Sequence, residues 1–228
     1  VPLAASGTGG MQMAVNNTAG RDDTALVVES GKFGERWSSM LEDRGVRVVP
    51  HRVPPGEAVP VESLARTLEE NPDVDLVYAT LVETSTLVRH PIQELGELLD
   101  DDQLLVVDAT SGFAADPFRP GEWNVALAVL GSQKGLMAPP GLSLVAASPR
   151  VVDRSESLPD RGTYFDLPTA VDKLDRENQT PWTPSMNLLR SLRSSLRRLE
   201  EEGLDACLDR HETLGAVCRK AVRTLGLE

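Results

Sequence analysis

The chain has 228 residues, of which 40% are apolar and 4% aromatic, enough for a substantial hydrophobic core. It carries 23 basic and 35 acidic residues, and the resulting net charge of −12 disfavours nucleic acids and anionic membranes as partners. No apolar run reaches the roughly 18 residues that a membrane-spanning helix needs.

The cysteines give no sign of a disulfide framework or a metal site. Cys207 and Cys218 both lie late in the chain, without metal-ligand spacing, so we expect ordinary thiols, no bound metal and a cytoplasmic location. The chain starts without Met in a strand pattern and stops in a helix pattern. We therefore expect it to be part of a longer protein.

Short apolar runs alternate with helix-period segments along residues 1–148. The strands are expected at residues 1–6, 24–30, 46–53, 75–83, 104–110, 125–132 and 142–148, and the helices between them at 10–19, 33–45, 61–72 and 91–102. Continuous apolar strands separated by single helices are typical of a mainly parallel sheet covered on both faces. With right-handed crossovers this predicts an α/β protein with three α/β/α layers.

The composition changes after residue 150, within a stretch that begins at Ser148. Residues 149–184 are polar and contain five prolines, so they are predicted to be turn-rich. Helix patterns follow at residues 186–203 and 204–226, with a break at Gly203. The arginines of the first helix are expected to form its solvated face; they are Arg190, Arg193, Arg197 and Arg198.

A glycine-rich turn, "ASGTGG", leads from the first strand into the first helix. Such a turn presents backbone N–H groups and a helix N-terminus to an anion. It is not a P-loop, because no GK[ST] follows, and Gln12 replaces the third glycine of the dinucleotide fingerprint. Taken alone, the turn leaves a phosphate cup and a plain tight turn both open.

Two charged residues follow other strands of the predicted sheet. Asp108 ends the apolar run "LLVVD", where a carboxylate either caps the next turn or pairs with a buried cation. Lys134 follows another run, and an amine in an interior-facing turn beside apolar walls would be nucleophilic. Because ligands gather beyond the carboxyl ends of parallel strands, cup, carboxylate and amine together match the needs of pyridoxal phosphate (PLP).

Several strings extend this match to nearly the whole chain. They are "ASGTGGMQMAV", "GKFGERW", "VETST", "VVDATSG", "GSQKGLMAPPGL" and "QTPWTP". On these residues the chain resembles the class V aminotransferases of PLP fold type I, and among them the alanine/serine–glyoxylate (serine–pyruvate) group. The string around Lys134 is the most specific of the set.

The resemblance assigns a role to each matching residue. Lys134 lies on the family's Schiff-base lysine, which also acts as general base, and Asp108 lies on the aspartate against the pyridine nitrogen. The remaining cofactor contacts implied are Ser6, Gly7 and Thr8 in the phosphate cup, Phe33 stacked on the ring, Thr84 near the phenolic oxygen, Gln133 on the phosphate, and Thr183 on the phosphate of a neighbouring subunit.

The resemblance also implies an organisation and an activity. Residues 1–184 would form the PLP-binding large domain, lacking its N-terminal segment, and residues 185–228 a long helix and the beginning of a truncated C-terminal domain. The implied enzyme is a homodimeric transaminase that moves an amino group from alanine or serine to a 2-oxo acid such as glyoxylate or pyruvate. Leu81, Leu87 and Gln12 depart from the family pattern, which carries His, Gly and often Glu at these positions.

Other functions remain open at this stage. A lyase-type PLP reaction would use the same scaffold, although a desulfurase usually has His before the lysine, where this chain has Gln133. A non-catalytic scaffold would need neither Lys134 nor Asp108. A nicotinamide-dependent dehydrogenase is disfavoured by the glycine spacing. His51 and His90 are expected to be structural rather than catalytic.

Overall fold

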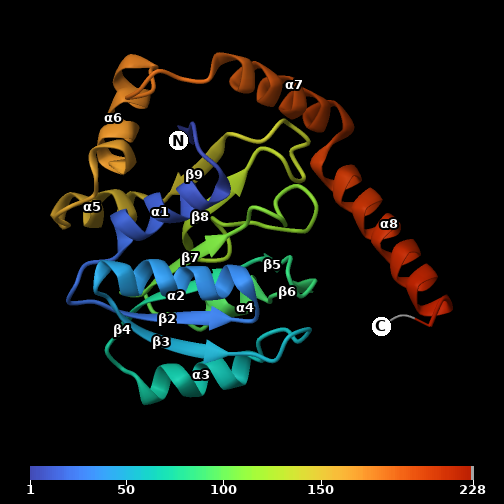
Figure 1. Ribbon diagram of the computed structural model, residues 1–228, viewed down its shortest axis with the longest axis horizontal. Helices are drawn as coiled ribbons and strands as arrows, with labels where there is room; N and C mark the ends of the chain where they lie inside the picture. Colours follow the sequence, from blue (N-terminus) through green and yellow to red (C-terminus); the bar gives the residue numbers. More distant parts are fainter. Residues whose placement is uncertain (227–228) are drawn as a thin grey trace.

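The computed structural model describes residues 1–226 and has a seven-stranded sheet at its centre (Figure 1). The strand order is β1-β9-β8-β7-β4-β2-β3. Neighbours from β8 through β7, β4 and β2 to β3 are parallel, whereas β9 is antiparallel to both β8 and β1. The strands are β1 (Pro2–Leu3), β2 (Thr24–Glu29), β3 (Arg47–Arg52), β4 (Val74–Thr80), β7 (Leu104–Asp108), β8 (Val125–Gly131) and β9 (Ser143–Ala147), and a separate pair is formed by β5 (Val82–Glu83) and β6 (Val88–Arg89).

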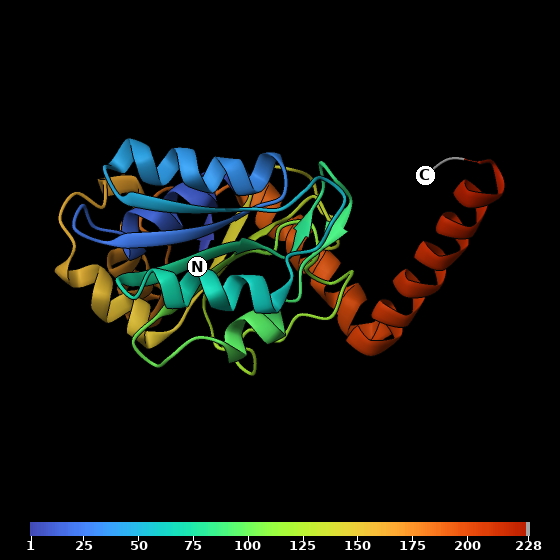
Figure 2. The same ribbon diagram turned by 90° about the horizontal axis from the view of Figure 1, so that it is seen from below.

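Helices cover both faces of this sheet. One face carries α1 (Gly7–Thr18), α2 (Lys32–Arg44), α5 (Pro149–Ser157) and α6 (Leu167–Glu177), and the other carries α3 (Val61–Glu70) and α4 (Ile92–Glu97). Figure 2 shows α2 on one side of the sheet and α3 and α4 on the opposite side. The predicted three-layer α/β/α arrangement with a mainly parallel sheet is confirmed.

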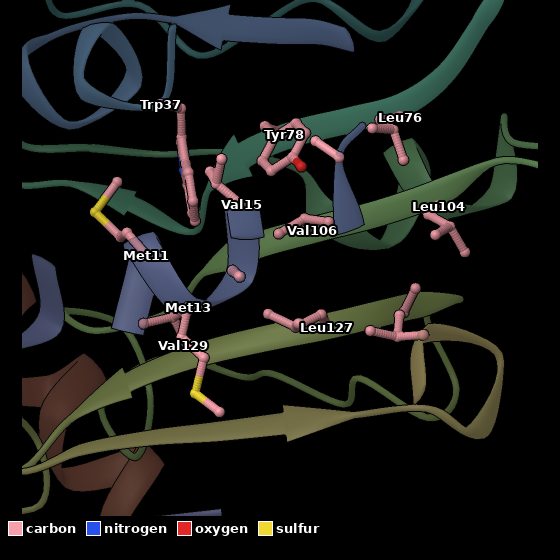
Figure 3. Close-up of a cluster of buried hydrophobic side chains, with 14 of the residues drawn as sticks. Met11, Met13, Val15, Trp37, Leu76, Tyr78, Leu104, Val106, Leu127 and Val129 are labelled. Atoms are coloured by element: carbon pink, nitrogen blue, oxygen red, sulfur yellow. The ribbon is translucent and has the colours of Figure 1, made fainter. Parts of the chain in front are cut away.

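The central strands are mostly apolar because their alternating side chains fill two different cores. In β7, Val106 belongs to the cluster under α1 and α2, whereas Val107 belongs to the cluster under α3 and α4. Figure 3 shows the first cluster, in which Trp37 of α2 lies next to Tyr78 of β4, with ring centroids 5.1 Å apart. Burying the side chains on both faces of a strand in this way stabilises the sheet from each side.

The glycine-rich turn proves to be the first turn of α1 itself. The helix begins at Gly7 rather than at residue 10, with Ser6 as its extended N-cap residue, and the first strand is limited to Pro2–Leu3. A side chain at Gly10 would bring its Cβ within 2.1 Å of Ser143 Oγ. The glycines therefore let α1 lie directly against the sheet, and this close packing was not foreseen from the sequence.

Residues 149–184 are more helical than predicted. Pro149 lies in the first turn of α5 and Pro168 in the first turn of α6, where the missing proline N–H has no helical partner to lose. Asp166 caps α6 by accepting a hydrogen bond from the Thr169 amide. The short 3₁₀ helix η1 (Thr163–Phe165) lies between the two. The prediction of a turn-rich segment was wrong at these two prolines because they begin helices.

The last two helices, α7 (Met186–Glu202) and α8 (Leu204–Thr224), are separated at Gly203 as predicted, and α8 extends away from the other elements (Figures 1 and 2). Gly203 adopts a φ of +86°, which few other residues tolerate. The four arginines predicted on the solvated face of α7 are all exposed. Cys207 is buried and Cys218 exposed, both as free thiols. No helix in the described part of the chain is long and apolar enough to cross a membrane.

His90 is a structural residue, as predicted, and it makes the stability of the fold depend on pH. The Val59 amide donates to Nδ1 (3.1 Å), so the neutral ring carries its proton on Nε2, which lies 2.6 Å from Ser30 Oγ. Burial lowers the pKa of His90 to about 4, from an unperturbed pKa near 6.5. A proton added at Nδ1 would meet an amide donor instead of an acceptor.

Because its pKa is lower in the folded chain, His90 contributes stability that is complete above pH 6.5 and is lost as pH falls towards 4. The loss should reach about 3 kcal/mol in the free energy of unfolding. Urea unfolding between pH 7 and pH 4.5 should show a steeper decline for the parent protein than for His90→Asn, whose Oδ1 can still accept from Val59. Parallel pH profiles for the two proteins would contradict this role.

Candidate active site

The polar clusters predicted at strand ends meet at one edge of the sheet. Asp108 is the last residue of β7 and pairs in register with Thr80, the last residue of β4. Gly131 ends β8 and pairs with Ser143 of β9, which also pairs with Leu3. The start of α1 and the loop carrying Lys134 therefore both follow at the carboxyl edge, beside Asp108.

The N-terminus of α1 offers free amide groups at this edge. The amides of Gly9 and Gly10 donate to the Ser6 carbonyl, and within residues 1–226 the amides of Gly7 and Thr8 have no acceptor. The Ser6 side chain does not cap the helix. The first-turn amides and the positive end of the helix dipole are thus available to an anion. This geometry favours the phosphate-cup interpretation over a plain tight turn.

Asp108 is a buried carboxylate with unused hydrogen-bonding capacity. It is 4% exposed, and its Oδ1 accepts from the Thr110 amide at 2.9 Å, while Oδ2 makes no hydrogen bond among the described residues. Burial raises the pKa of the Asp108 carboxyl, and the hydrogen bond from the Thr110 amide acts in the opposite direction. A cationic N–H donor beside Asp108 would relieve this unfavourable burial of charge.

Two further polar atoms beside the α1 N-terminus are buried without a partner: Thr110 Oγ1 and Gln133 Oε1. A Cβ at Gly7 would lie 3.0 Å from Thr110 Oγ1, and one at Gly131 would lie 3.1 Å from Gln133 Oε1. Buried polar atoms without partners are rare in proteins and mark places where a ligand or water completes the hydrogen bonding. Sequence reasoning included Gln133 but missed Thr110, although "DATSG" contained it.

Lys134 lies in the turn that follows β8, and its side chain is exposed. The expected apolar walls do not bury it in this chain, so that expectation was wrong. The apolar residues beside it point elsewhere: Leu136 and Leu142 pack against Leu192 of α7 and anchor the turn. The amine therefore stands on a fixed turn at the edge of the site.

Phe33 lies at the start of α2, whose first amides are bound by a buried carboxylate. Glu83 is fully buried, and its Oε2 accepts from the amides of Phe33 and Gly34, each at 3.0 Å. Its Oε1 accepts from the amide and hydroxyl of Ser85. Glu83 thus ties the α2 N-terminus to the loop that carries Thr84. The sequence alone did not identify Glu83, because the α2 amide of Phe33 that it binds lies 50 residues away along the chain.

Thr84 and Thr183 occupy different positions relative to this cluster. Thr84 Oγ1 lies 2.7 Å from Ser111 Oγ, in the loop that follows Asp108. Thr183 is exposed and lines a small apolar pocket with Ala4, Tyr164 and Trp182. Within one chain the structure does not bring Thr183 to the other predicted residues.

The two leucines that depart from the family pattern lie on either side of Thr84. Leu81 is fully buried and packs so closely on Gly112 that a Cβ there would meet it at 2.5 Å. Leu87 is 86% exposed and adopts a φ of +58°, a left-handed conformation that leucine rarely takes. Neither leucine disturbs the residues around Asp108.

Replacing Glu83 by alanine is expected to lower the free energy of unfolding by about 3–5 kcal/mol. The change leaves the buried amides of Phe33 and Gly34 without an acceptor. Glu83→Gln keeps an acceptor for them and should cost less. Urea unfolding would measure both, and Glu35→Ala, which removes an exposed carboxylate of α2, is the control. A loss of less than about 1 kcal/mol in the free energy of unfolding for Glu83→Ala would contradict the proposed role of Glu83 in holding the start of α2.

A model of the family described as aminotransferase class-V matches residues 4–227. The chain belongs to the class-V aminotransferase family. Among curated relatives, this family member is similar to the L-aspartate–glyoxylate aminotransferase of Paracoccus denitrificans (35% identical, covering 98% of this chain and 57% of that protein). It is also similar to the serine–glyoxylate aminotransferase of Hyphomicrobium methylovorum (36% identical, covering 98% and 56%).

Among solved structures, the crystal structure of alanine–glyoxylate aminotransferase from Nostoc sp. matches this class-V family member with a TM-score of 0.94 and 28% identity. That match covers 100% of this chain and 61% of the other. The chain thus spans less than two thirds of the length of these proteins. Its architecture is the fold type I arrangement that the sequence predicts.

Proposed function

We propose that the protein containing this chain is a PLP-dependent aminotransferase. Its substrates would be a small amino acid, alanine or serine, and a 2-oxo acid such as glyoxylate or pyruvate. The observation that supports the proposal best is the meeting of three groups at one sheet edge: the free amides of α1, the buried carboxylate of Asp108 and the amine of Lys134. The named relatives, which act with glyoxylate on aspartate or serine, support the same substrate class.

The residues at this edge fit PLP chemically. A phosphate needs several hydrogen-bond donors, and the Gly7 and Thr8 amides and the unpartnered Thr110 hydroxyl supply them, with Ser6 and Gln133 alongside. A pyridine N–H needs a buried carboxylate with a free oxygen, and Asp108 has one. Bound PLP supplies an electron-withdrawing ring that lowers the barrier to removing a proton from the substrate Cα.

The protein's own groups would divide the remaining work. Lys134 Nζ would hold the cofactor covalently, would be released when the substrate amine takes its place, and would then accept the proton from the substrate Cα as general base. Asp108 would accept the pyridine N–H and hold that proton on the ring throughout the reaction. Phe33 would stack on the ring, and Thr84 would bind its phenolic oxygen.

The proposal includes a homodimer in which Thr183 completes the partner's phosphate site. Its exposure and its separation from the other predicted residues within one chain are consistent with this role. It also includes a cytoplasmic location, supported by composition alone. Residues 1–184 would be the large domain and residues 185–228 the beginning of a C-terminal domain.

A donor and acceptor screen tests the proposed reaction. The full-length protein, loaded with PLP, would be incubated with alanine, serine or aspartate and with glyoxylate or pyruvate, and the new amino acid identified by mass spectrometry. Formation of glycine from glyoxylate, and of the 2-oxo acid from the donor, supports amino transfer. Release of ammonia without a new amino acid would point to a lyase, and inertness with bound PLP to a scaffold.

A further inference from the structure

Arg36 of α2 links two of the proposed cofactor contacts. Its guanidinium Nη1 donates to Thr8 Oγ1 at 2.9 Å, across the gap between α2 and the N-terminus of α1. Its central carbon lies 4.8 Å from the centroid of the Phe33 ring, in a cation–π arrangement. One side chain thus contacts a phosphate-cup residue and the residue expected to stack on the cofactor.

The guanidinium of Arg36 forms no ion pair within the described residues, although its charge acts on Asp108, where it opposes the rise in pKa that burial causes. No carboxylate lies within 4.0 Å of its guanidinium in residues 1–226, although the side chain is half-buried. Half-buried arginines usually pair with an anion, because partial burial weakens their hydration. Next to the free amides of α1, the missing partner is most simply an anion bound at that helix end.

The hydrogen bond to Arg36 also determines what the Thr8 hydroxyl can do. A hydroxyl has one proton to donate, and an arginine can only donate, so Thr8 Oγ1 is the acceptor in this pair. The Thr8 proton therefore remains free for another acceptor. A charged donor polarises the hydroxyl and strengthens the hydrogen bond that it donates.

The position of Arg36 is fixed from the other side as well. Glu83 holds the Phe33 and Gly34 amides, so the first turn of α2 cannot rotate without losing two buried hydrogen bonds. Arg36 lies one turn further along the helix, with its guanidinium over the Phe33 ring. In this arrangement the guanidinium contacts both the Phe33 ring and the Thr8 hydroxyl.

We propose that Arg36 is a positioning residue of the cofactor site, which orients the Thr8 hydroxyl towards the cofactor phosphate and supplies positive charge to the cup. This inference rests on the proposed function, because it requires a phosphate at the α1 N-terminus. Arg36 would act on the phosphate through Thr8, its main contact, and more weakly on the ring through Phe33. The loss of Arg36 should therefore weaken the binding of a ligand with a phosphate more than that of a ligand without one.

The experiment compares PLP with pyridoxal, which lacks the phosphate, as ligands of the cofactor-free full-length protein. Arg36→Met keeps the length of the stem and removes the guanidinium. We expect it to weaken PLP binding by about 10- to 100-fold, the range for a charged hydrogen bond, and to change pyridoxal binding by less than about threefold. Arg66→Met, on the opposite face of the sheet, is the control for a lost surface charge.

Three further variants separate a positioning role from a structural one. Arg36→Lys keeps the charge but loses the guanidinium geometry, and should lie between the parent and Arg36→Met. In a Thr8→Val background, Arg36→Met should weaken PLP binding several-fold less than in the parent, because its main contact is already gone. The unfolding midpoint of each variant in urea shows whether it is folded.

Equal losses of PLP and pyridoxal affinity in Arg36→Met, or additive effects of Arg36→Met and Thr8→Val, would overturn this inference while leaving the proposed function intact. Failure of the folded parent protein to bind PLP would overturn the proposed function, and this inference with it. Selective loss of PLP affinity together with non-additivity supports both.

Discussion

Replacing Lys134 by alanine is expected to reduce amino transfer by about 10⁴-fold, the upper end of what one general base contributes. The substitution removes the amine of the turn that follows β8, the strand paired with β7, which ends at Asp108. Because Lys134 is exposed on a turn anchored by Leu136 and Leu142, the change should leave the free energy of unfolding within about 0.5 kcal/mol.

The measurement is the steady-state rate of keto-acid formation by the full-length protein. Lys173→Ala, which removes another surface lysine, should keep the parent rate. A small primary amine in solution should restore part of the activity of Lys134→Ala, since the missing group is an amine. A rate within tenfold of the parent would exclude Lys134 from the reaction.

The second large effect is expected at Asp108. Asp108→Asn keeps an oxygen for the Thr110 amide but replaces a charged acceptor with a neutral one at the cofactor nitrogen. We expect the rate of Cα–H removal to fall by about 10²-fold and PLP affinity by less than about tenfold, because the charge matters most when electrons move into the ring. Single-turnover exchange of a deuterated substrate Cα would measure the first, and a PLP titration the second.

The same substitution should stabilise the cofactor-free protein. Burial raises the pKa of Asp108 in the folded chain, so this carboxyl favours folding below its ordinary pKa near 3.9 and loses that contribution as pH rises through its folded pKa. Asp108→Asn is not subject to that loss. Its unfolding midpoint in urea should exceed that of the parent at pH 7, and the difference should disappear near pH 3.5.

Asp102→Asn, in an exposed turn, serves as the control for the lost charge. A lower midpoint for Asp108→Asn than for the parent at pH 7 would mean that the carboxylate stabilises the fold and is not held there for the cofactor. Active sites commonly contain residues that lower the stability of the fold because the function requires them.

The sheet could be predicted because each strand has a recognisable run of apolar residues. Residues 104–107 are apolar without interruption, a pattern typical of a strand with both faces covered. The site followed from the same logic, since Asp108 and Lys134 had to fall at carboxyl ends. The helix after Ser148 was missed because a proline has two opposite meanings. Within a helix it breaks the hydrogen bonding, but in the first turn, where Pro149 lies, it is well tolerated.

What the sequence could not predict are contacts between distant segments. Glu83 binds α2, and Arg36 meets Thr8, through backbone and side-chain geometry that has no local pattern. The unpartnered Thr110 hydroxyl is significant only because α1 approaches it. The exposure of Lys134 likewise depends on how its turn packs on α7. Long-range packing, rather than local preference, determines each of these features.

The most direct test of the central claim is borohydride reduction of the full-length protein in the presence of PLP, followed by peptide mass mapping. A phosphopyridoxyl group on the peptide containing Lys134, absent in Lys134→Ala, is the result that we predict. Modification of other lysines alone, or none from folded protein with PLP in excess, would contradict the claim that this sheet edge is a PLP site.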